Sequence, residues 1–286
     1  MEKFKSFITE AKEDKYRILV ISAEPDNNKM FHTAQRVTDE AEKLGHDVYV
    51  VKVEGASITY DTGYKIFNAN DKKGFEIGND TVAIVRGSVR LKKSYLDLLT
   101  QLEKIGVCMV NSRETVEVSS DKYRTYVKLQ DYGLNQPKTV LIPNADTWEQ
   151  ALESLDSKFP IIMKTLEGSK GIGVLFIESE RQIESLVQLL YNQNDDVDLL
   201  IQEYIKTDGD IRVIVLGGKI IASMKRDVVE GDFRSNVSQG AKVEEYPLTE
   251  LEVEHSLLAA KAIDGSWTAV DFIPSKNPKK EPPYIL

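Results

Sequence analysis

Cysteine is almost absent from this chain, because Cys108 is the only one among 286 residues. A single cysteine excludes an intrachain disulfide and is typical of a reducing cytoplasm. Cys108 lies in the apolar run 107–110, which indicates a core residue and not a nucleophile. Histidine is also scarce, and His32, His46 and His255 are so scattered that we interpret them as surface or helix-end residues, not as a metal site.

The sequence has no apolar run of the roughly 18–20 residues that a membrane-spanning helix needs. Its polar N-terminus, 1–16, has no secretory apolar segment. The net charge of −9 argues against bulk binding to nucleic acid or an anionic membrane, while leaving room for a local basic pocket. No Gly-x-Gly-x-x-Gly motif follows the first expected strand, so a dinucleotide site is not expected there. These features predict a cytoplasmic protein without nucleic-acid or membrane partners.

The first part of the chain alternates between expected strands and helices. Apolar runs predict strands, and longer amphipathic segments predict helices. The segments are, in chain order, strand 17–22, helix 31–44, strand 47–53, strand 81–85, helix 91–105 and strand 107–110. This order predicts a parallel sheet in an α/β domain over residues 16–112, preceded by an N-terminal extension over 1–15.

The remainder predicts two α+β subdomains, a central one over 113–198 and a C-terminal one over 199–286. Ser119 or Ser120 is expected to cap a helix over 121–131. The other expected elements are strands 160–164, 174–177, 199–204, 211–216, 219–224, 268–273 and 284–286 and helices 180–190 and 251–262. The pair Gly217-Gly218 predicts a two-residue hairpin turn between its flanking strands.

A glycine-rich segment separates two of these strands and carries the first chemical signal. Gly168, Gly171 and Gly173, with Ser169, would let the backbone fold closely over a phosphate chain. Lys164 stands just before this segment, where its ammonium could neutralise phosphate charge. A hairpin with a flexible tip is the alternative interpretation of the glycines.

Three further groups of residues suggest ligand binding. The strand end 202–205 has backbone that could bind an adenine edge, or it is simply a strand end. Cations and polar residues gather on the expected hairpin and beyond it, at Asp210, Arg212, Lys225, Arg226, Arg234, Ser235 and Asn236. In an acidic protein they suggest phosphates and substrate carboxylates, against the alternative of a solvated charged face. Asp271 lies inside an apolar strand, where a carboxylate must bind a metal or be hydrogen-bonded.

The order of these features resembles ATP-grasp enzymes and, within them, the ribosomal-protein glutamate ligase (RimK-type) branch. The resemblance covers nearly the whole chain. Five stretches carry it: Ser120-Asp-Lys-Tyr-Arg-Thr125, Met163-Lys-Thr-Leu-Glu-Gly-Ser-Lys-Gly-Ile-Gly-Val174, Gln202-Glu-Tyr-Ile205, Asp210-Ile-Arg212 and Glu230-Gly-Asp-Phe-Arg-Ser-Asn236. The last of them is specific to this branch. The resemblance implies an ATP-grasp fold behind an N-terminal parallel-sheet domain.

The resemblance implies a role for each matched residue on the nucleotide side. Lys122 and Lys164 would contact the α- and β-phosphates of ATP, and the glycine segment with Gly168, Ser169, Gly171 and Gly173 would close over the triphosphate. Gln202, Glu203 and Tyr204 would lie at the adenine, and Asp210 near the ribose.

On the reacting side, Arg234, Ser235 and Asn236 would face the phosphates and the reacting carboxylate. Asp271 would bind Mg²⁺, with Mn²⁺ as an alternative ion. Arg212 and Arg226 would orient carboxylate or acyl-phosphate oxygens, and Arg86 could reach the substrate. The implied activity joins glutamate or a similar amino acid to the carboxylate of a protein C-terminus, peptide or small molecule through an acyl-phosphate. Family members often form dimers or tetramers, so a homo-oligomer is a further expectation.

The chain departs from the family pattern at its end. The pattern continues after the Asp271 strand with Glu-x-Asn, which supplies further metal ligands, whereas this chain ends at Leu286. We therefore expect a C-terminal subdomain shorter than the family's, weakened or absent catalysis by this chain and retained ATP binding. Two alternatives stay open: a nucleotide-binding protein without ligase activity, and another ATP-grasp ligase of the glutathione-synthase or lysine-biosynthesis type.

Overall fold

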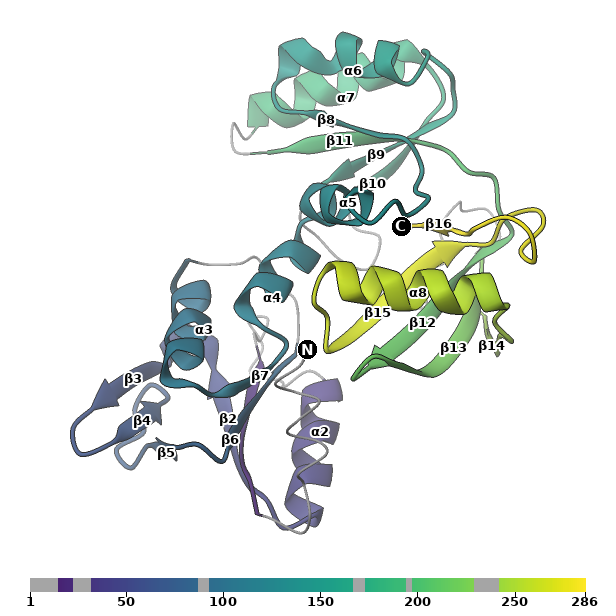
Figure 1. The fold of residues 1–286 in the computed structure, drawn as a ribbon. Helices are drawn as coiled ribbons and strands as arrows, with labels where there is room; N and C mark the ends of the chain where they lie inside the picture. Colours follow the sequence, from purple (N-terminus) through teal and green to yellow (C-terminus); the bar gives the residue numbers. More distant parts are fainter. Residues whose placement is uncertain (1–14, 23–31, 87–92, 167–172, 194–196, 229–241) are drawn as a thin grey trace. The chain divides into compact units, whose positions relative to one another are not determined.

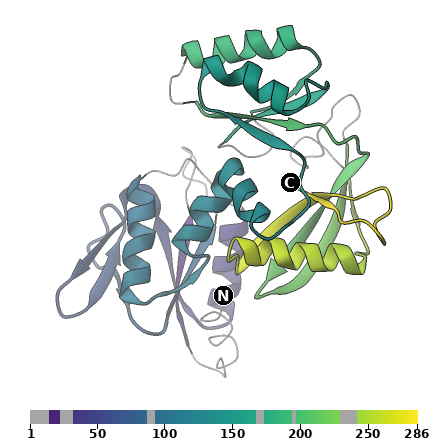
Figure 2. The ribbon, with the colours of Figure 1, turned by 45° about the horizontal axis from the view of Figure 1, so that its top comes forward.

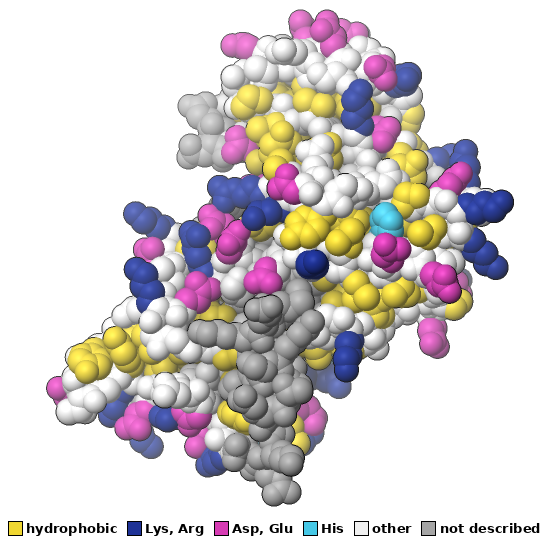
Figure 3. Space-filling view, viewed as in Figure 1, with side chains coloured by type: hydrophobic (Ala, Val, Ile, Leu, Met, Phe, Trp, Pro, Cys, Tyr) yellow, Lys and Arg dark blue, Asp and Glu magenta, His cyan; other side chains and the backbone are white. Residues whose placement is uncertain are grey.

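The computed structural model describes residues 15–22, 32–86, 93–166, 173–193, 197–228 and 242–286. The chain divides into two compact units. Unit 1 comprises Met1–Glu117 and Asp264–Trp267, and unit 2 comprises Val118–Ile263 and Thr268–Leu286. Figure 3 shows acidic and basic side chains interspersed over the visible face of the molecule. No helix within the described ranges is long and apolar enough to cross a membrane.

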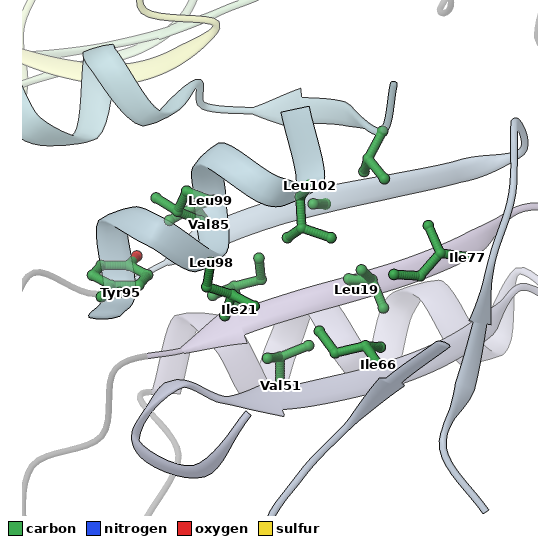
Figure 4. Close-up of a cluster of buried hydrophobic side chains, with 12 residues drawn as sticks. Leu19, Ile21, Val51, Ile66, Ile77, Val85, Tyr95, Leu98, Leu99 and Leu102 are labelled. Carbon is green, nitrogen blue, oxygen red and sulfur yellow. The ribbon is translucent and has the colours of Figure 1, made fainter. Parts of the chain in front are cut away.

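Unit 1 is built on a four-stranded parallel sheet of order β2-β1-β6-β7. Its strands are β1 (Arg17–Ser22), β2 (Asp47–Lys52), β6 (Thr81–Arg86) and β7 (Cys108–Val110), and its long helices are α2 (His32–Lys43) and α3 (Lys93–Ile105). Side chains alternate between the two faces of each strand. Leu19 and Ile21 join the core that α3 contributes to (Figure 4), whereas Ile18 and Val20 pack with α2. The predicted parallel α/β domain is confirmed.

Unit 1 also contains elements that the sequence did not predict. A small antiparallel sheet consists of β3 (Ser57–Tyr60), β4 (Tyr64–Phe67) and β5 (Phe75–Ile77), after the short helix η1 (Val53–Gly55). These strands are three or four residues long and partly exposed, so they have little apolar periodicity. Cys108 is only half-buried.

A short helix, α4 (Arg113–Ser120), also escaped prediction. Ser119 and Ser120 are the last two residues of this helix, so neither serine caps the next one. The cap of α5 (Lys122–Gln130) is Asp121, whose carboxylate accepts from the backbone N–H groups of Tyr123 and Arg124. Asp121 satisfies the same unpaired donors that a serine would satisfy, and its negative charge favours the helix N-terminus.

The middle sheet of unit 2 has the order β10-β9-β11-β8. Its elements are β8 (Thr139–Ile142), η2 (Ala145–Thr147), α6 (Trp148–Ser154), β9 (Ile161–Thr165), β10 (Val174–Ile177), α7 (Glu180–Gln193) and β11 (Leu199–Glu203). Figures 1 and 2 both show α6 and α7 on one side of this sheet, where they enclose an apolar core. Strand β11 pairs with β8 and β9, so the middle sheet extends beyond the boundary that we predicted at 198/199.

The last sheet of unit 2 has the order β14-β13-β12-β15-β16. Its elements are β12 (Gly209–Leu216), β13 (Lys219–Asp227), β14 (Val243–Glu245), α8 (Glu250–Ala262), β15 (Trp267–Ile273) and β16 (Tyr284–Ile285). Gly217 and Gly218 have φ of +58° and +77°, which a two-residue hairpin turn requires, as predicted. Thr249 and Glu252 form a capping box at the start of α8.

Candidate functional site

A pocket lies within unit 2, between the middle sheet and the last sheet. The end of α4, helix α5, the middle sheet and the residue after β11 contribute polar side chains, namely Ser119, Lys122, Thr125, Tyr126, Thr139, Lys164, Gln202, Glu203 and Tyr204. The last sheet contributes Asp210, Arg226, Asp271, Ile273, Ile285 and Leu286. The pocket thus gathers most of the predicted site residues that the structure describes, although their positions span most of unit 2 in sequence.

Two lysines meet at this pocket. Lys164 stands near the end of β9, and Lys122 begins α5 beside it, because the backbone N–H of Lys122 donates to Leu166 O at 3.2 Å. The ammonium of Lys122 donates to the carbonyl oxygens of Thr165 at 2.9 Å and Leu166 at 3.1 Å. The ammonium of Lys164 donates to Gln202 Oε1 at 2.7 Å. All three of these bonds end on neutral oxygens, so the bond to Gln202 does not neutralise the charge of Lys164.

The low pKa of Lys164 shows that its surroundings disfavour the charged form of the side chain. Burial lowers the pKa of Lys164 to about 8, and the nearby Lys122 charge lowers it further. Among the described residues, no carboxylate forms an ion pair with Lys164. A buried cation without a counter-ion is costly, so it indicates a site for an anion supplied by a ligand.

Gln202 is held so that its amide oxygen points at Lys164. Its Nε2 donates to Thr139 Oγ1 at 2.8 Å, and that hydroxyl donates to Pro137 O at 2.9 Å. This chain of bonds fixes which end of the amide faces the ammonium. Sequence reasoning missed Thr139, because nothing in the run 139–142 separates it from an ordinary strand residue.

The end of β11 and the residues after it carry the predicted adenine residues. Glu203 Oε1 accepts from the backbone N–H of Lys138 at 2.8 Å, so this carboxylate braces the end of β8. Tyr204 packs edge-on against Phe176, with ring centroids 5.0 Å apart. No hydrogen bond between described residues uses the backbone of Tyr204 or Ile205, although both line the pocket. These backbone groups are available to a ligand.

Two acids and two arginines of the last sheet form a charge network, and all of them except Arg212 line the pocket. Register pairs Asp210 with Arg226 across β12 and β13, and the two make a bidentate ion pair with both bonds at 2.6 Å. Arg226 also reaches Asp271 at 3.0 Å. Arg212 donates to Asp271 at 2.7 and 2.5 Å. Their side chains alternate charge in the order Asp210, Arg226, Asp271, Arg212, so each charge has a partner.

The network sets the protonation of its members. Burial raises the pKa of Asp271, but hydrogen bonds and charges from Arg212 and Arg226 outweigh burial and lower it below its usual value. Burial likewise disfavours charge on Arg226, whereas Asp210 and Asp271 raise its pKa overall. Asp271 is therefore a carboxylate at neutral pH and chemically able to bind a cation. The described residues contain no cluster of three acids, histidines or cysteines that could hold a metal on its own.

Lys225 does not converge on the pocket. It alternates with Arg226 along β13, so it faces the other way, and it pairs with Asp208 at 3.1 Å and Asp227 at 3.3 Å. Lys225 therefore does not join the other described cations of the predicted group in binding an anion at the pocket. Arg212 and Arg226 do meet, on Asp271.

The glycine segment is described only at its far end. Gly173 has φ of +77°, and its carbonyl accepts from Thr165 N–H at 3.0 Å, which joins the two arms of the β9–β10 hairpin. The remaining predicted site residues, Gly168, Ser169, Gly171, Arg234, Ser235 and Asn236, lie outside the described residues.

The end of the chain contributes residues that the sequence did not single out. Ile285 and Leu286 line the pocket, and Leu286 N–H donates to Asp271 O at 2.9 Å. Ile285 N–H donates to Asn135 O at 2.8 Å, which ties β16 to the residues after α5. The sequence contains no local signal for either contact, because both depend on pairing between distant segments.

Known proteins share this architecture. An ATP-grasp protein with a RimK domain from Sphaerobacter thermophilus superposes with a TM-score of 0.68 at 15% identity, covering 94% of this chain and 89% of that one. The ATP-grasp ligase PsnB, solved with a minimal precursor, Mg and ADP, superposes with a TM-score of 0.64 at 17% identity, covering 94% and 87%. These similarities show that the chain has the ATP-grasp fold.

Sequence comparison narrows the class further. The RimK-like ATP-grasp domain model matches residues 119–280, and the chain belongs to this family. A probable alpha-L-glutamate ligase of Pseudoalteromonas translucida is 32% identical over 254 residues, covering 87% of this chain and 82% of the relative. The resemblance inferred from the five sequence motifs is confirmed.

Proposed function

We propose that the chain is an ATP-dependent ligase that joins the amino group of glutamate, or of a similar amino acid, to an acceptor carboxylate. The carrying observation is Lys164, a half-buried ammonium held by the neutral amide of Gln202 beside a second lysine, in one pocket. That pocket suits a nucleoside triphosphate. The family and the name of the similar glutamate ligase support glutamate as the amino acid.

The proposed reaction has two steps. An oxygen of the acceptor carboxylate attacks the γ-phosphorus of ATP, and ADP leaves with the electron pair of the broken P–O bond. The amine then attacks the acyl carbon, loses a proton, and expels phosphate as the C–O bond breaks. Neither step needs covalent participation by the protein, so its contribution is to position the reactants and to neutralise charge.

The described residues suit different parts of this task. Lys122 and Lys164 would neutralise the phosphates that leave with ADP. The backbone at Tyr204 and Ile205 would bind the adenine edge. Arg212 and Arg226 would orient the oxygens of the carboxylate and of the acyl-phosphate, since planar guanidinium groups bind two oxygens at once.

Mg²⁺, or Mn²⁺ in its place, fits this site through Asp271. A carboxylate with a lowered pKa is an oxygen ligand of the type that Mg²⁺ prefers, and Mg²⁺ in nucleotide sites commonly uses one or two carboxylates with phosphates and water. When bound, the ion would supply further charge neutralisation on the phosphates. Asp271 would have to exchange part of its contact with Arg212 or Arg226 for the ion.

The acceptor, cellular location and assembly belong to the same proposal. We place the protein in the cytoplasm, with a protein C-terminus, a peptide or a small molecule as acceptor and a homo-oligomer as a possible assembly. The sequence composition supports the location, and the family supports an acceptor with a free carboxylate.

The test is phosphate release from Mg-ATP, with an acceptor peptide ending in Glu and each amino acid in turn, followed by mass spectrometry of the peptide. We expect release that requires L-glutamate and a matching mass gain. Lys164→Met should weaken ATP binding by about tenfold or more. The matched control is Lys158→Met, because the Lys158 side chain is 79% exposed and should leave both readouts unchanged. Saturable ATP binding without amino-acid-dependent release would favour a nucleotide-binding protein without ligase activity.

A further inference from the structure

Unit 1 has a second cluster of polar groups, at the carboxyl edge of its parallel sheet. Ser22 is the last residue of β1, and Arg86 is the last residue of β6. The two are direct register partners, so their Cα atoms lie about 5 Å apart. Both follow Ile18, Val20 and Ile84 with period two, which places them on one face of the sheet. Ligands of open α/β sheets commonly bind at this edge.

Arg86 is held in place by an aromatic ring. Its guanidinium carbon lies 4.2 Å from the ring centroid of Trp267. Trp267 is fixed in turn by Asn111, the residue after β7: the amide of Asn111 donates to Trp267 O at 2.8 Å and accepts from Trp267 N–H at 2.8 Å. Three neighbouring strands therefore end in Ser22, Arg86 and the clamp on Trp267, all within unit 1.

Two polar atoms at this edge have no hydrogen-bond partner among the described residues. They are Arg86 Nε and Ser22 Oγ, both buried, and Ser22 as a whole is 1% exposed. No ion pair between described residues includes Arg86, and burial lowers the pKa of Arg86 with no carboxylate to offset it. Arg17, another partly buried arginine of unit 1, is stabilised differently, since it pairs with Asp80 at 2.6 Å. An uncompensated guanidinium beside an unsatisfied hydroxyl is costly unless a ligand supplies the anion.

We propose that Arg86, with the Ser22 hydroxyl beside it and the Trp267 ring supporting it, binds a carboxylate group of a substrate of the ligase reaction. The identity of the ligand rests on the proposed function, whereas the anion site rests on unit 1 alone. A guanidinium presents two parallel N–H donors to the two oxygens of a carboxylate, and a serine hydroxyl can add a third bond. Glutamate and the acceptor both carry such a group, and the experiment separates them.

The experiment is titration calorimetry on the full chain saturated with Mg and a non-hydrolysable ATP analogue. The probes are L-glutamate and a peptide ending in Glu. Arg86→Met should weaken binding of at least one probe by about 10- to 100-fold, Arg86→Lys by less, and Ser22→Ala by a few-fold. Binding of the nucleotide analogue should not change. The matched control is Arg113→Gln, because Arg113 is a surface arginine of unit 1 that pairs with Glu117.

Each outcome decides the inference. Loss of L-glutamate binding assigns the site to the amino acid, and loss of peptide binding assigns it to the acceptor. Either loss supports the proposed carboxylate site. Unchanged binding of both probes in Arg86→Met overturns it, even if the wild-type chain forms the amide. Absence of amide formation by the wild type counts against the proposed function instead, and the titration still judges the site. The melting temperature of Arg86→Met distinguishes a ligand-binding role from a structural one. Removing an uncompensated buried charge should not lower this temperature.

Discussion

The unusual charge on Lys164 leads to a specific prediction about pH. Its pKa is lowered from 10.5 to about 8 in the folded protein, so the folded state holds the proton less tightly than the unfolded chain does. Between about pH 8 and the unfolded value, stability should therefore rise with pH, because the unfolded state binds more protons there. The cost of keeping Lys164 charged below about pH 8 is at most about 3 kcal/mol, at 1.36 kcal/mol per pKa unit.

Binding of ATP should offset the free-energy cost of keeping Lys164 charged. Phosphates beside Lys164 favour the charged form, so ATP binding above about pH 8 must be accompanied by uptake of one proton. The dissociation constant for ATP should then rise by about tenfold per pH unit above that point, until the pKa of the bound state is reached. The phosphates of ATP are themselves fully ionised well below this range, so they add no slope.

The assay is calorimetric or fluorescence titration with ATP between pH 7 and 9.5 in buffers of different ionisation enthalpy. The wild-type chain should show the slope and the proton uptake. Lys164→Met should bind ATP more weakly at pH 7 and show a flat profile, whereas Lys158→Met should behave as the wild type. An equal slope in Lys164→Met would refute the assignment of the titrating group to Lys164.

Three further predictions concern the stability of the protein and the end of the glycine segment. Arg226→Met should lower the free energy of unfolding of unit 2 by about 3–5 kcal/mol, because it removes the bidentate ion pair of the nearly buried Asp210. Arg212→Met should cost less because Asp271 keeps its contact with Arg226, and equal losses in urea unfolding would contradict the network. Tyr95→Phe should raise the free energy of unfolding by about 1 kcal/mol, because the buried Tyr95 hydroxyl has no hydrogen-bond partner in the described ranges, and a loss of stability would show an unrecognised bond. Gly173→Ala should cost about 1–2 kcal/mol and weaken ATP binding, because the added Cβ would meet Thr165 Oγ1 at 2.3 Å with φ of +77°; unchanged melting and unchanged ATP affinity would contradict it.

The elements that the sequence predicted well are those with strong local signals. Strands such as β1 and β9 are apolar runs, and the Gly217-Gly218 turn is set by two residues that adopt positive φ without strain. The strands β3 to β5 were missed because their partners, and not their own apolar pattern, hold them in a sheet. The cap of α5 was predicted at Ser119 or Ser120, one or two residues before Asp121, because serine and aspartate are equally good caps.

The candidate site also has parts that the local sequence predicted and parts that depend on the pairing of distant segments. Lys164, Gln202, Asp210, Arg226 and Asp271 were found from residue type and order, and the structure brings them to one pocket. Their pairing could not be predicted, because a charge network depends on which strands become neighbours. Asp271 illustrates this: the sequence favoured a metal ligand, and the structure shows a carboxylate held by two arginines that remains chemically able to bind one. Thr139 and Leu286 carry no signal, since only distant pairing brings them to the pocket.

The most direct test of the central claim follows an oxygen atom through the reaction. An acceptor whose reacting carboxylate carries a heavy oxygen isotope would be incubated with the chain, Mg-ATP and L-glutamate, and the released phosphate analysed by mass spectrometry. The account predicts one labelled oxygen in the phosphate, formed together with ADP and the amide, because the carboxylate oxygen leaves with the phosphoryl group. Label in AMP, or amide formed with unlabelled phosphate, would contradict an acyl-phosphate route.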